Sequence, residues 1–338
     1  MVDATHLRFK ASDRSYFSIL KKEIHQQAVN ADFDVKKLAD LDVIVSEMTS
    51  NLHKYGKEGE ILSGIFTEGN LKYIELICLD HGPGMSDTAK MMTDGVSSSS
   101  TMGMGLGSIN RMSDEFEIYS QKGWGTILLS RIYHTSQKTK RMALPVVIRP
   151  LVICMPGQQK SGDGIYHKLT DQYLKILVAD GLGHGEEANR AVNEAVSAFK
   201  TCPYHSPSEI IRFMHSSIRK TRGMVAAVVV YDFKIKTWKV AGVGNISVRL
   251  QDFMAMKNIL SYNGIVGHNI PNTINDQELS SSDYPMITLC SDGIKSRWEM
   301  NRLPGIARTD LTIQAAAVYK DFARQTDDMT ILIAKANR

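Results

Sequence analysis

Residues 80–84 have the sequence Asp-His-Gly-Pro-Gly and directly follow the apolar run 73–79. The run has the composition of a buried strand, so the pattern predicts that Asp80 stands at the end of a central strand. Gly82 and Gly84 let the backbone pass close to a ligand, because they carry no side chain. Taken alone, the stretch has a second interpretation as a plain turn, since Gly-Pro and Pro-Gly pairs are common in turns.

A helical pattern precedes this strand and covers about residues 34–55. Glu47 and Asn51 are four residues apart on it, so both side chains leave the same face, with their Cβ atoms about 5 to 6 Å apart. A carboxylate and an amide at that distance are able to share one ligand. The pair alone is more often part of a solvated helix face.

A glycine string follows the strand, with Gly103, Gly105 and Gly107 at alternate positions ahead of a helix-like segment, 108–112. Free backbone N–H groups at such a helix start are suited to binding anionic oxygens. The string is not a Walker motif, because no Gly-Lys-Ser/Thr follows it. A flexible loop is the alternative interpretation when the string is considered alone.

The order of these parts resembles the Bergerat-type ATP-binding fold, also called GHKL, of histidine kinases, gyrase and heat-shock chaperones. It is most similar to the anti-sigma-factor serine kinases within that group. The resemblance covers about residues 10–133 and includes the texts Ser-Glu-Met-Thr-Ser-Asn at 46–51 and Gly-Trp-Gly-Thr at 123–126. No phosphohistidine segment or dimerisation helix precedes the motifs, which argues against a histidine kinase.

The resemblance implies a site for ATP and Mg²⁺. By it, Asn51 holds Mg²⁺ at the phosphates, Glu47 is the catalytic base toward a serine hydroxyl, and Asp80 binds the adenine amino group. Lys54 is one turn past Asn51 and could reach a phosphate, although a solvated lysine is the commoner case. The other expected nucleotide-binding residues are Gly82, Gly84, Gly103, Gly105 and Gly107, and the loop 97–107 is expected to close over the triphosphate.

Acidic residues recur beside β-like runs in the second half of the chain. They are Asp163, Asp180, Asp292 and the pair Asp327 and Asp328. Any one Asp-Gly pair is usually a turn. Gathered together, however, carboxylates repel one another unless cations lie between them. Oxygen ligands without a Cys or His cluster favour Mg²⁺ or Mn²⁺ over zinc.

The ordered set, with Asp-Gly-Leu-Gly-His-Gly at 180–185, resembles the bacterial branch of the metal-dependent PPM-type serine/threonine phosphatases over about residues 144–335. The resemblance implies two Mn²⁺ or Mg²⁺ ions. Asp180 would bridge them and the Gly181 carbonyl would ligate one. The remaining expected ligands are Asp292, Asp327 and, directly or through water, Asp163.

Four further residues of this half have open roles. Ser161 is better interpreted as a loop serine than as a nucleophile, because no His/Asp partner is placed by the sequence. His184 either contacts substrate or fills its loop. Lys160 and His167 are alternative candidates for binding the substrate phosphate, and the sequence does not choose between them.

Length and composition limit the classes of protein to which this chain could belong. The chain of 338 residues is long enough for two cores. Its net charge of +4 is far from a field that binds nucleic acid or membranes, and no apolar run approaches the roughly 20 residues of a membrane span. The four cysteines form no metal or redox spacing. We expect a cytoplasmic protein.

The expected fold class is α+β in two domains, an N-terminal Bergerat-type α/β sandwich and a C-terminal α-β-β-α phosphatase sandwich. The expected boundaries are 1–134 for the ATP-binding domain, 135–143 for a polar linker and 144–338 for the phosphatase domain.

The two resemblances together imply a bifunctional regulator of a partner-switching stress or sigma-factor pathway. Its substrate would be a STAS-domain antagonist or scaffold protein, and a sigma-factor regulatory phosphatase or another switch protein is a further expected partner. In the alternative, the N-terminal domain binds nucleotide without transferring phosphate and regulates the phosphatase. A weaker third possibility is a scaffold with two inactive sites.

Overall fold

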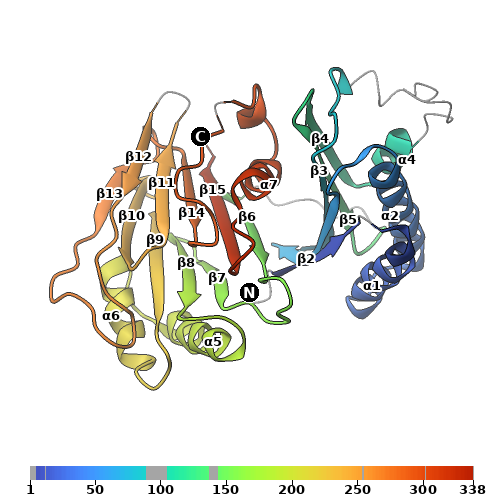
Figure 1. The fold of residues 1–338 in the computed structure, drawn as a ribbon. Coiled ribbons are helices and arrows are strands. Elements are labelled where there is room, and N and C mark those ends of the chain that lie inside the picture. The colour runs from blue at the N-terminus through green and yellow to red at the C-terminus, as the bar shows by residue number, and fades with distance from the viewer. Residues whose placement is uncertain are drawn as a thin grey trace. The chain divides into compact units, whose positions relative to one another are not determined.

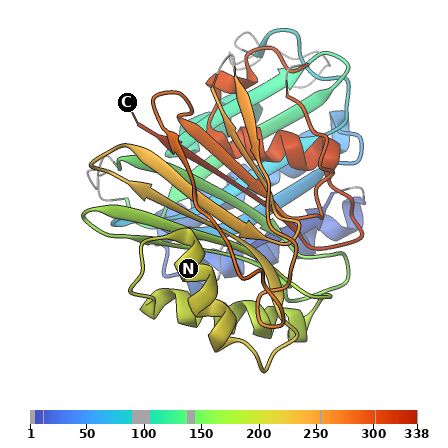
Figure 2. The same cartoon turned by 90° about the vertical axis from the view of Figure 1, so that its left-hand side faces the viewer.

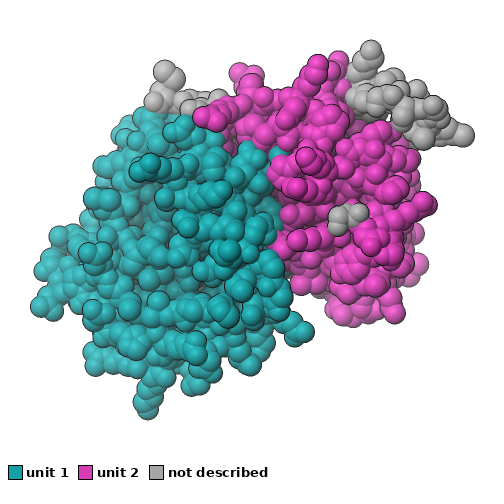
Figure 3. Space-filling model, viewed as in Figure 1, with its two compact units in different colours: residues 1–5, 144–299, 318–338 teal, residues 6–143, 300–317 magenta. Residues whose placement is uncertain are grey.

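The computed structural model describes residues 5–11, 13–88, 105–136, 144–252, 255–300 and 302–337. The chain divides into two compact units, which Figure 3 distinguishes by colour. The amino-terminal unit comprises residues 6–143 and 300–317. The carboxy-terminal unit comprises residues 1–5, 144–299 and 318–338. The expected linker lies mostly outside the described residues, and the expected domain boundaries remain predictions.

The amino-terminal unit is an antiparallel sheet whose helices within residues 17–112 cover one face (Figure 1). Its strand order is β1-β2-β3-β5-β4, with every neighbouring pair antiparallel. The strands are β1 (Thr5–Lys10), β2 (Glu60–Glu68), β3 (Leu71–Asp80), β4 (Glu115–Gln121) and β5 (Gly125–Tyr133). The helices are η1 (Arg14–Tyr16), α1 (Phe17–Asn30), α2 (Val35–Tyr55), α4 (Gly105–Met112), η2 (Ile306–Arg308) and the first part of α7 (Leu311–Phe322).

Helix α2 packs on the sheet through one apolar stripe. Leu41, Ile44 and Met48 recur at helical spacing and are completely buried, together with Ile74 and Leu76 of β3. The helix ends at Gly56, whose N–H donates to the carbonyl of Leu52 at 2.9 Å. The packing therefore fixes the orientation of α2 and of its half-buried residues Glu47 and Asn51, two of the predicted nucleotide residues.

The carboxy-terminal unit contains two antiparallel sheets. One has the order β13-β10-β9-β8-β7, and strands of the other follow the order β12-β11-β14-β15-β6. The strands are β6 (Val146–Ile153), β7 (Asp163–Leu169), β8 (Tyr173–Gly181), β9 (Met224–Asp232), β10 (Thr237–Val243), β11 (Ser247–Gln251), β12 (Met256–Ile259), β13 (Gln277–Ser280), β14 (Met286–Cys290) and β15 (Met329–Ala336). The helices are α5 (Glu186–Thr201), α6 (Pro207–Ser217) and the second part of α7.

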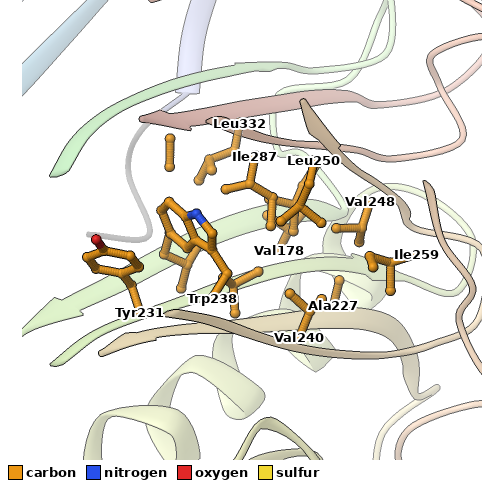
Figure 4. Packing of buried hydrophobic residues seen from close by; sticks show 14 of the residues in the cluster. Val178, Ala227, Tyr231, Trp238, Val240, Val248, Leu250, Ile259, Ile287 and Leu332 are labelled. Carbon is orange, nitrogen blue, oxygen red and sulfur yellow. The ribbon is translucent and has the colours of Figure 1, made fainter. Parts of the chain in front are cut away.

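The two sheets face each other across a continuous apolar core (Figure 4). Trp238 of β10 is fully buried in it and lies among side chains of both sheets, including Val178 and Leu332. A second cluster fills the space between the outer face of β8 and β9 and the helices α5 and α6, which Figure 2 shows on one side of that sheet. The predicted mixed α/β class with two domains is confirmed. Among the described residues, no helix is long and apolar enough to span a bilayer.

Candidate nucleotide and metal sites

The predicted nucleotide residues of α2 meet the start of α4. A Cβ atom on Gly105 would lie 2.8 Å from Glu47 Oε2 and 3.5 Å from Asn51 Oδ1. A side chain at this position would require the Glu47 carboxylate to shift. Gly105 and Gly107 belong to α4, and Gly103 lies outside the described residues. A carboxylate, an amide and the first turn of a helix are thus brought together, and their role in nucleotide binding stays a prediction.

The loop after β3 is held against the end of α2. The Gly82 N–H donates to Asp80 Oδ1 at 2.6 Å, and a Cβ on Gly82 would lie 2.4 Å from the Tyr55 carbonyl oxygen. Gly84 has a positive φ of 67°, a conformation that favours glycine. Lys54 is exposed on α2. Asp80 and the Glu47–Asn51 pair therefore belong to neighbouring segments of one unit, while the roles assigned to them stay predictions.

Two of the predicted metal ligands face each other across a strand pair. Asp163 opens β7 and is directly opposite Asp180, near the end of β8. Burial raises the pKa of Asp163 to about 7, the nearby Asp327 and Asp328 carboxylates add to this, and the hydroxyls of Ser291 and Thr330 partly oppose it. Asp163 Oδ2 is buried with no hydrogen-bond partner among the described residues. This oxygen is an acceptor that lacks a donor or a cation.

Asp180 experiences the combined negative charge of the other carboxylates. Burial is the largest cause that raises its pKa to about 9, followed by Asp163, Asp292, Asp327 and Asp328. Asp292 Oδ2 accepts a hydrogen bond from Asn245 Nδ2 at 2.9 Å. The structure therefore brings the predicted acidic residues into electrostatic contact.

The carboxylates do not form a preorganised metal-binding site. Among the described residues, no three His, Cys, Asp or Glu side chains are gathered closely enough to hold an ion. The partnerless oxygen of Asp163 and the all-oxygen donor set nevertheless fit Mg²⁺ or Mn²⁺. A bound cation would relieve the mutual repulsion of these carboxylates.

Asp327 and Asp328 differ in their surroundings. Both oxygens of Asp328 accept backbone N–H groups at 2.7 Å, Oδ1 from Met155 and Oδ2 from Gly162. Asp328 is 2% exposed, whereas Asp327 is half-buried. Asp328 thus fixes the loop that leads to Asp163, whereas the assignment of Asp327 as a metal ligand stays a prediction.

The loop that follows Asp180 requires glycine at Gly181. A Cβ there would lie 2.4 Å from the Ala188 carbonyl oxygen, because the first turns of α5 pack directly on the loop. Gly185 is the N-cap of α5 with a φ of 76°. This close packing places the Gly181 backbone beside Asp180, where its carbonyl is the predicted ligand.

One cationic residue near this loop was missed by the sequence analysis. Arg222 Nη1 lies 3.3 Å from the Cβ position of Gly183, in the loop between Asp180 and α5. Of the two predicted phosphate-binding candidates, Lys160 forms an exposed ion pair with Glu186 at 2.9 Å. His167 is four residues along β7 from Asp163, which corresponds to about 13 Å in an extended strand. A lone Arg in a polar turn carries no periodic signal that would have identified it.

The remaining two residues with open roles differ in exposure. Ser161 is 4% exposed, its Oγ accepts from the Asp163 N–H at 3.1 Å, and its carbonyl accepts from Asn189 Nδ2 at 2.8 Å. These contacts give it a structural function in the loop. His184 is exposed in the loop after Asp180.

Comparisons with known proteins define two domain types in this chain. Residues 12–131 match the histidine kinase-like ATPase domain, and residues 170–337 match stage II sporulation protein E, SpoIIE. The chain therefore joins a GHKL-like ATPase domain to a SpoIIE-type, PP2C-like phosphatase domain, which is the architecture of a partner-switching regulator. The predicted resemblances and fold class are confirmed.

Curated relatives specify the first domain. The chain is 32% identical to the anti-sigma F factors of two Thermoanaerobacter strains over 117 residues, 33% of this chain and 80% of theirs. It is 35% identical to the serine/threonine-protein kinase RsbT of Bacillus subtilis over 88 residues, 26% of this chain and 66% of the kinase. The chain belongs to the anti-sigma-factor family of histidine kinase-like ATPase domains.

Solved structures give a further comparison. A chain from the bacterial stressosome, described as a modular system adapted to control secondary messenger signaling, is 26% identical with a TM-score of 0.52, over 56% of this chain and 99% of that chain. RsbX in complex with magnesium is 17% identical with a TM-score of 0.51, over 58% of this chain and 98% of that chain. The second likeness shows the fold alone.

Proposed function

We propose that this protein is a bifunctional partner-switching regulator that phosphorylates and dephosphorylates serine or threonine on a STAS-domain protein. The observation that carries the phosphatase assignment is the group of mutually repelling carboxylates around Asp180. The position of Gly105 against Glu47 and Asn51 supports the kinase assignment. Similarity to an anti-sigma-factor kinase and a stressosome chain supports the choice of partner class.

In the kinase step, the substrate hydroxyl oxygen forms a bond to the γ-phosphorus of ATP, and the bond between that phosphorus and the β–γ bridging oxygen breaks. The hydroxyl proton passes to the carboxylate of Glu47, and ADP leaves. Asn51 offers an amide oxygen on the same helix face, and the backbone at Gly105 lies close to both side chains, where it would meet the phosphates. Asp80, whose Oδ1 also accepts from Gly82, would bind the adenine amino group.

In the phosphatase step, the oxygen of a water molecule forms a bond to the substrate phosphorus, and the bond to the seryl or threonyl oxygen breaks. The products are the free hydroxyl, which takes a proton, and inorganic phosphate. Two divalent cations, when bound, would supply an activated water and neutralise the phosphoryl charge. Asp163, Asp180, Asp292, Asp327 and the Gly181 carbonyl would hold them, and Arg222 would bind the phosphate.

The test uses the full chain with a STAS-domain protein, radiolabelled ATP and Mn²⁺. Glu47→Ala is expected to abolish label incorporation, whereas Asp327→Asn is expected to let labelled STAS protein accumulate. Equal labelling by the two variants would contradict opposed activities. ATP binding by the wild type without transfer to any STAS protein would favour the alternative, a nucleotide-sensing domain that regulates the phosphatase.

A further inference from the structure

The loop at residues 291–299, here called the Asp292 loop, carries the predicted metal ligand Asp292 and directly follows β14. Strand β14 pairs with β11 in antiparallel register, and its last residue, Cys290, is opposite Ser247, the first residue of β11. The turn that precedes β11 and the loop that follows β14 therefore leave the sheet beside each other. All of these residues belong to the carboxy-terminal unit by itself.

The turn between β10 and β11 is tightly packed and holds Asn245. The N–H of Gly244 donates to the Tyr262 carbonyl at 2.8 Å. Gly244 has a φ of 99°, and a Cβ atom on it would overlap the side chain of Val225. The backbone beside Asn245 is thus fixed, and Asn245 Nδ2 donates to Asp292 Oδ2 at 2.9 Å.

The backbone of the Asp292 loop is fixed from its other side. A Cβ atom on Gly293 would overlap the Asp328 carbonyl oxygen, and the Arg324 N–H donates to the Gly293 carbonyl at 2.8 Å. The backbone at Asp292 therefore has little freedom, whereas its side chain still has rotamers to choose among. The contact with Asn245 restricts that choice.

An amide donor suits the electrostatic surroundings of Asp292. This carboxylate is one of the charges that raise the pKa of Asp180, so the two groups repel each other. The amide N–H of Asn245 binds Asp292 without adding a further negative charge. It engages Oδ2 and leaves Oδ1 available to a cation, as a hydrogen-bonding partner behind a metal ligand does.

The far end of the Asp292 loop is held by Arg249 of β11. Its Nη1 donates to the Trp298 carbonyl at 2.8 Å, and the guanidinium carbon lies 4.0 Å from the centroid of the Trp298 ring. Its Nε donates to Asn258 Oδ1 of β12 at 3.2 Å. Burial raises the pKa of the Cys290 thiol to about 12, and Arg249 partly opposes this, so the guanidinium lies near the end of β14. The stacking and the hydrogen bonds use the planar fork of arginine, which lysine lacks.

We propose that Asn245 and Arg249 position Asp292 for the phosphatase metal site, Asn245 at the carboxylate and Arg249 at the far end of the loop. Both act through Asp292 and are therefore positioning residues. A carboxylate that is already held in one orientation loses less conformational freedom when a cation binds, so its affinity for the cation is higher. The inference rests on the proposed phosphatase function, because it takes Asp292 as a metal ligand.

The first test compares Asn245→Ala with Asn272→Ala, both in the full chain. Asn245→Ala removes the amide donor from an exposed turn, and Asn272 is an exposed asparagine of the same unit. Mn²⁺ affinity is measured by calorimetry, and urea unfolding is followed in EDTA. Asn245→Ala is expected to weaken Mn²⁺ binding about ten-fold or more with an unchanged urea midpoint in EDTA, while Asn272→Ala changes neither.

The second test is Arg249→Lys, which keeps the charge but loses the planar fork. It is expected to speed backbone hydrogen exchange in 294–298 in EDTA, and to weaken Mn²⁺ binding less than Asn245→Ala does. Should Arg249→Lys fail to fold, Asn258→Ala removes one acceptor of the same guanidinium from the exposed strand β12, and faster exchange in 294–298 is again expected.

Unchanged Mn²⁺ affinity in Asn245→Ala, or an equal loss in Asn272→Ala, would overturn the proposal. A loss of affinity matched by a lower urea midpoint in EDTA would also overturn it, because that result indicates a structural role alone. Unchanged exchange in 294–298 would remove Arg249 from the proposal. These measurements need no turnover, so a wild type that binds Mn²⁺ but hydrolyses no phosphoprotein would refute the proposed function and leave the positioning of Asp292 to be decided by them.

Discussion

Replacing Asp163 with Asn is expected to stabilise the metal-free protein and to abolish its stabilisation by Mn²⁺. The Asp163 carboxyl is 5% exposed, one of its oxygens has no partner among the described residues, and its pKa is raised from 3.8 to about 7. As pH rises above 3.8 the unfolded chain loses this proton while the folded chain keeps it, so stability falls until pH passes about 7. The full shift corresponds to about 4 kcal/mol.

An Asn side chain does not ionise, so the stability of the variant does not fall with pH for this reason. In EDTA at pH 8, Asp163→Asn is expected to be more stable than the wild type by about 2 to 4 kcal/mol, and at pH 4 the gain should vanish. Urea unfolding of the wild type and the variant at the two pH values, with EDTA or with Mn²⁺, measures the free energy of unfolding. A variant that is less stable than the wild type in EDTA at pH 8, or that gains as much from Mn²⁺, would refute the electrostatic account.

Three further substitutions test the sites separately. Gly181→Ala should abolish phosphatase activity at a stability cost of about 1 to 3 kcal/mol, since its Cβ would lie 2.4 Å from a carbonyl oxygen, while nucleotide binding measured by calorimetry stays unchanged. Glu47→Gln should retain ATP binding but slow phosphoryl transfer about 10² to 10⁴-fold in a single-turnover assay, and normal transfer would exclude Glu47 as base. Arg222→Ala should raise KM for a phosphoserine protein far more than it lowers kcat in steady-state kinetics, and an unchanged KM would remove Arg222 from the phosphate site.

Much of the fold could be predicted because its elements are strongly periodic. The expected helix 34–55 agrees with α2 within one residue at each end. Apolar spacing alone locates it, since it buries one stripe against a sheet. Strands β1 and β7 were among the strands that the sequence did not predict. β1, Thr-His-Leu-Arg-Phe-Lys, buries His6 and Phe9, which are three residues apart, so its burial does not follow the two-residue period of a strand. β7, Asp-Gly-Ile-Tyr-His-Lys-Leu, begins with an Asp-Gly pair that is typical of a turn.

The candidate sites were predicted from residue type and order more than from local pattern. Asp163 was expected near the metals, and its place opposite Asp180 depends on the register of β7 with β8, which one sequence does not encode locally. Gly105 was expected to approach phosphates. Its close approach to Glu47 and Asn51 is a property of how α4 packs on α2. The motifs therefore predicted which residues belong to the sites, whereas the pairing of strands and helices determines how close those residues lie.

The partners of Arg131 could not be predicted from the sequence around it. It lies in the run Leu-Leu-Ser-Arg-Ile of β5, where an isolated charge in an apolar strand signals only that partners must exist. Those partners come from three places, Glu75 and Glu115 on neighbouring strands and Asp310 some 180 residues later. Removing one partner of a buried ion pair costs about 3 to 5 kcal/mol, because the other charge stays desolvated. The partners that satisfy Arg131 therefore include residues that no local pattern around β5 could reveal.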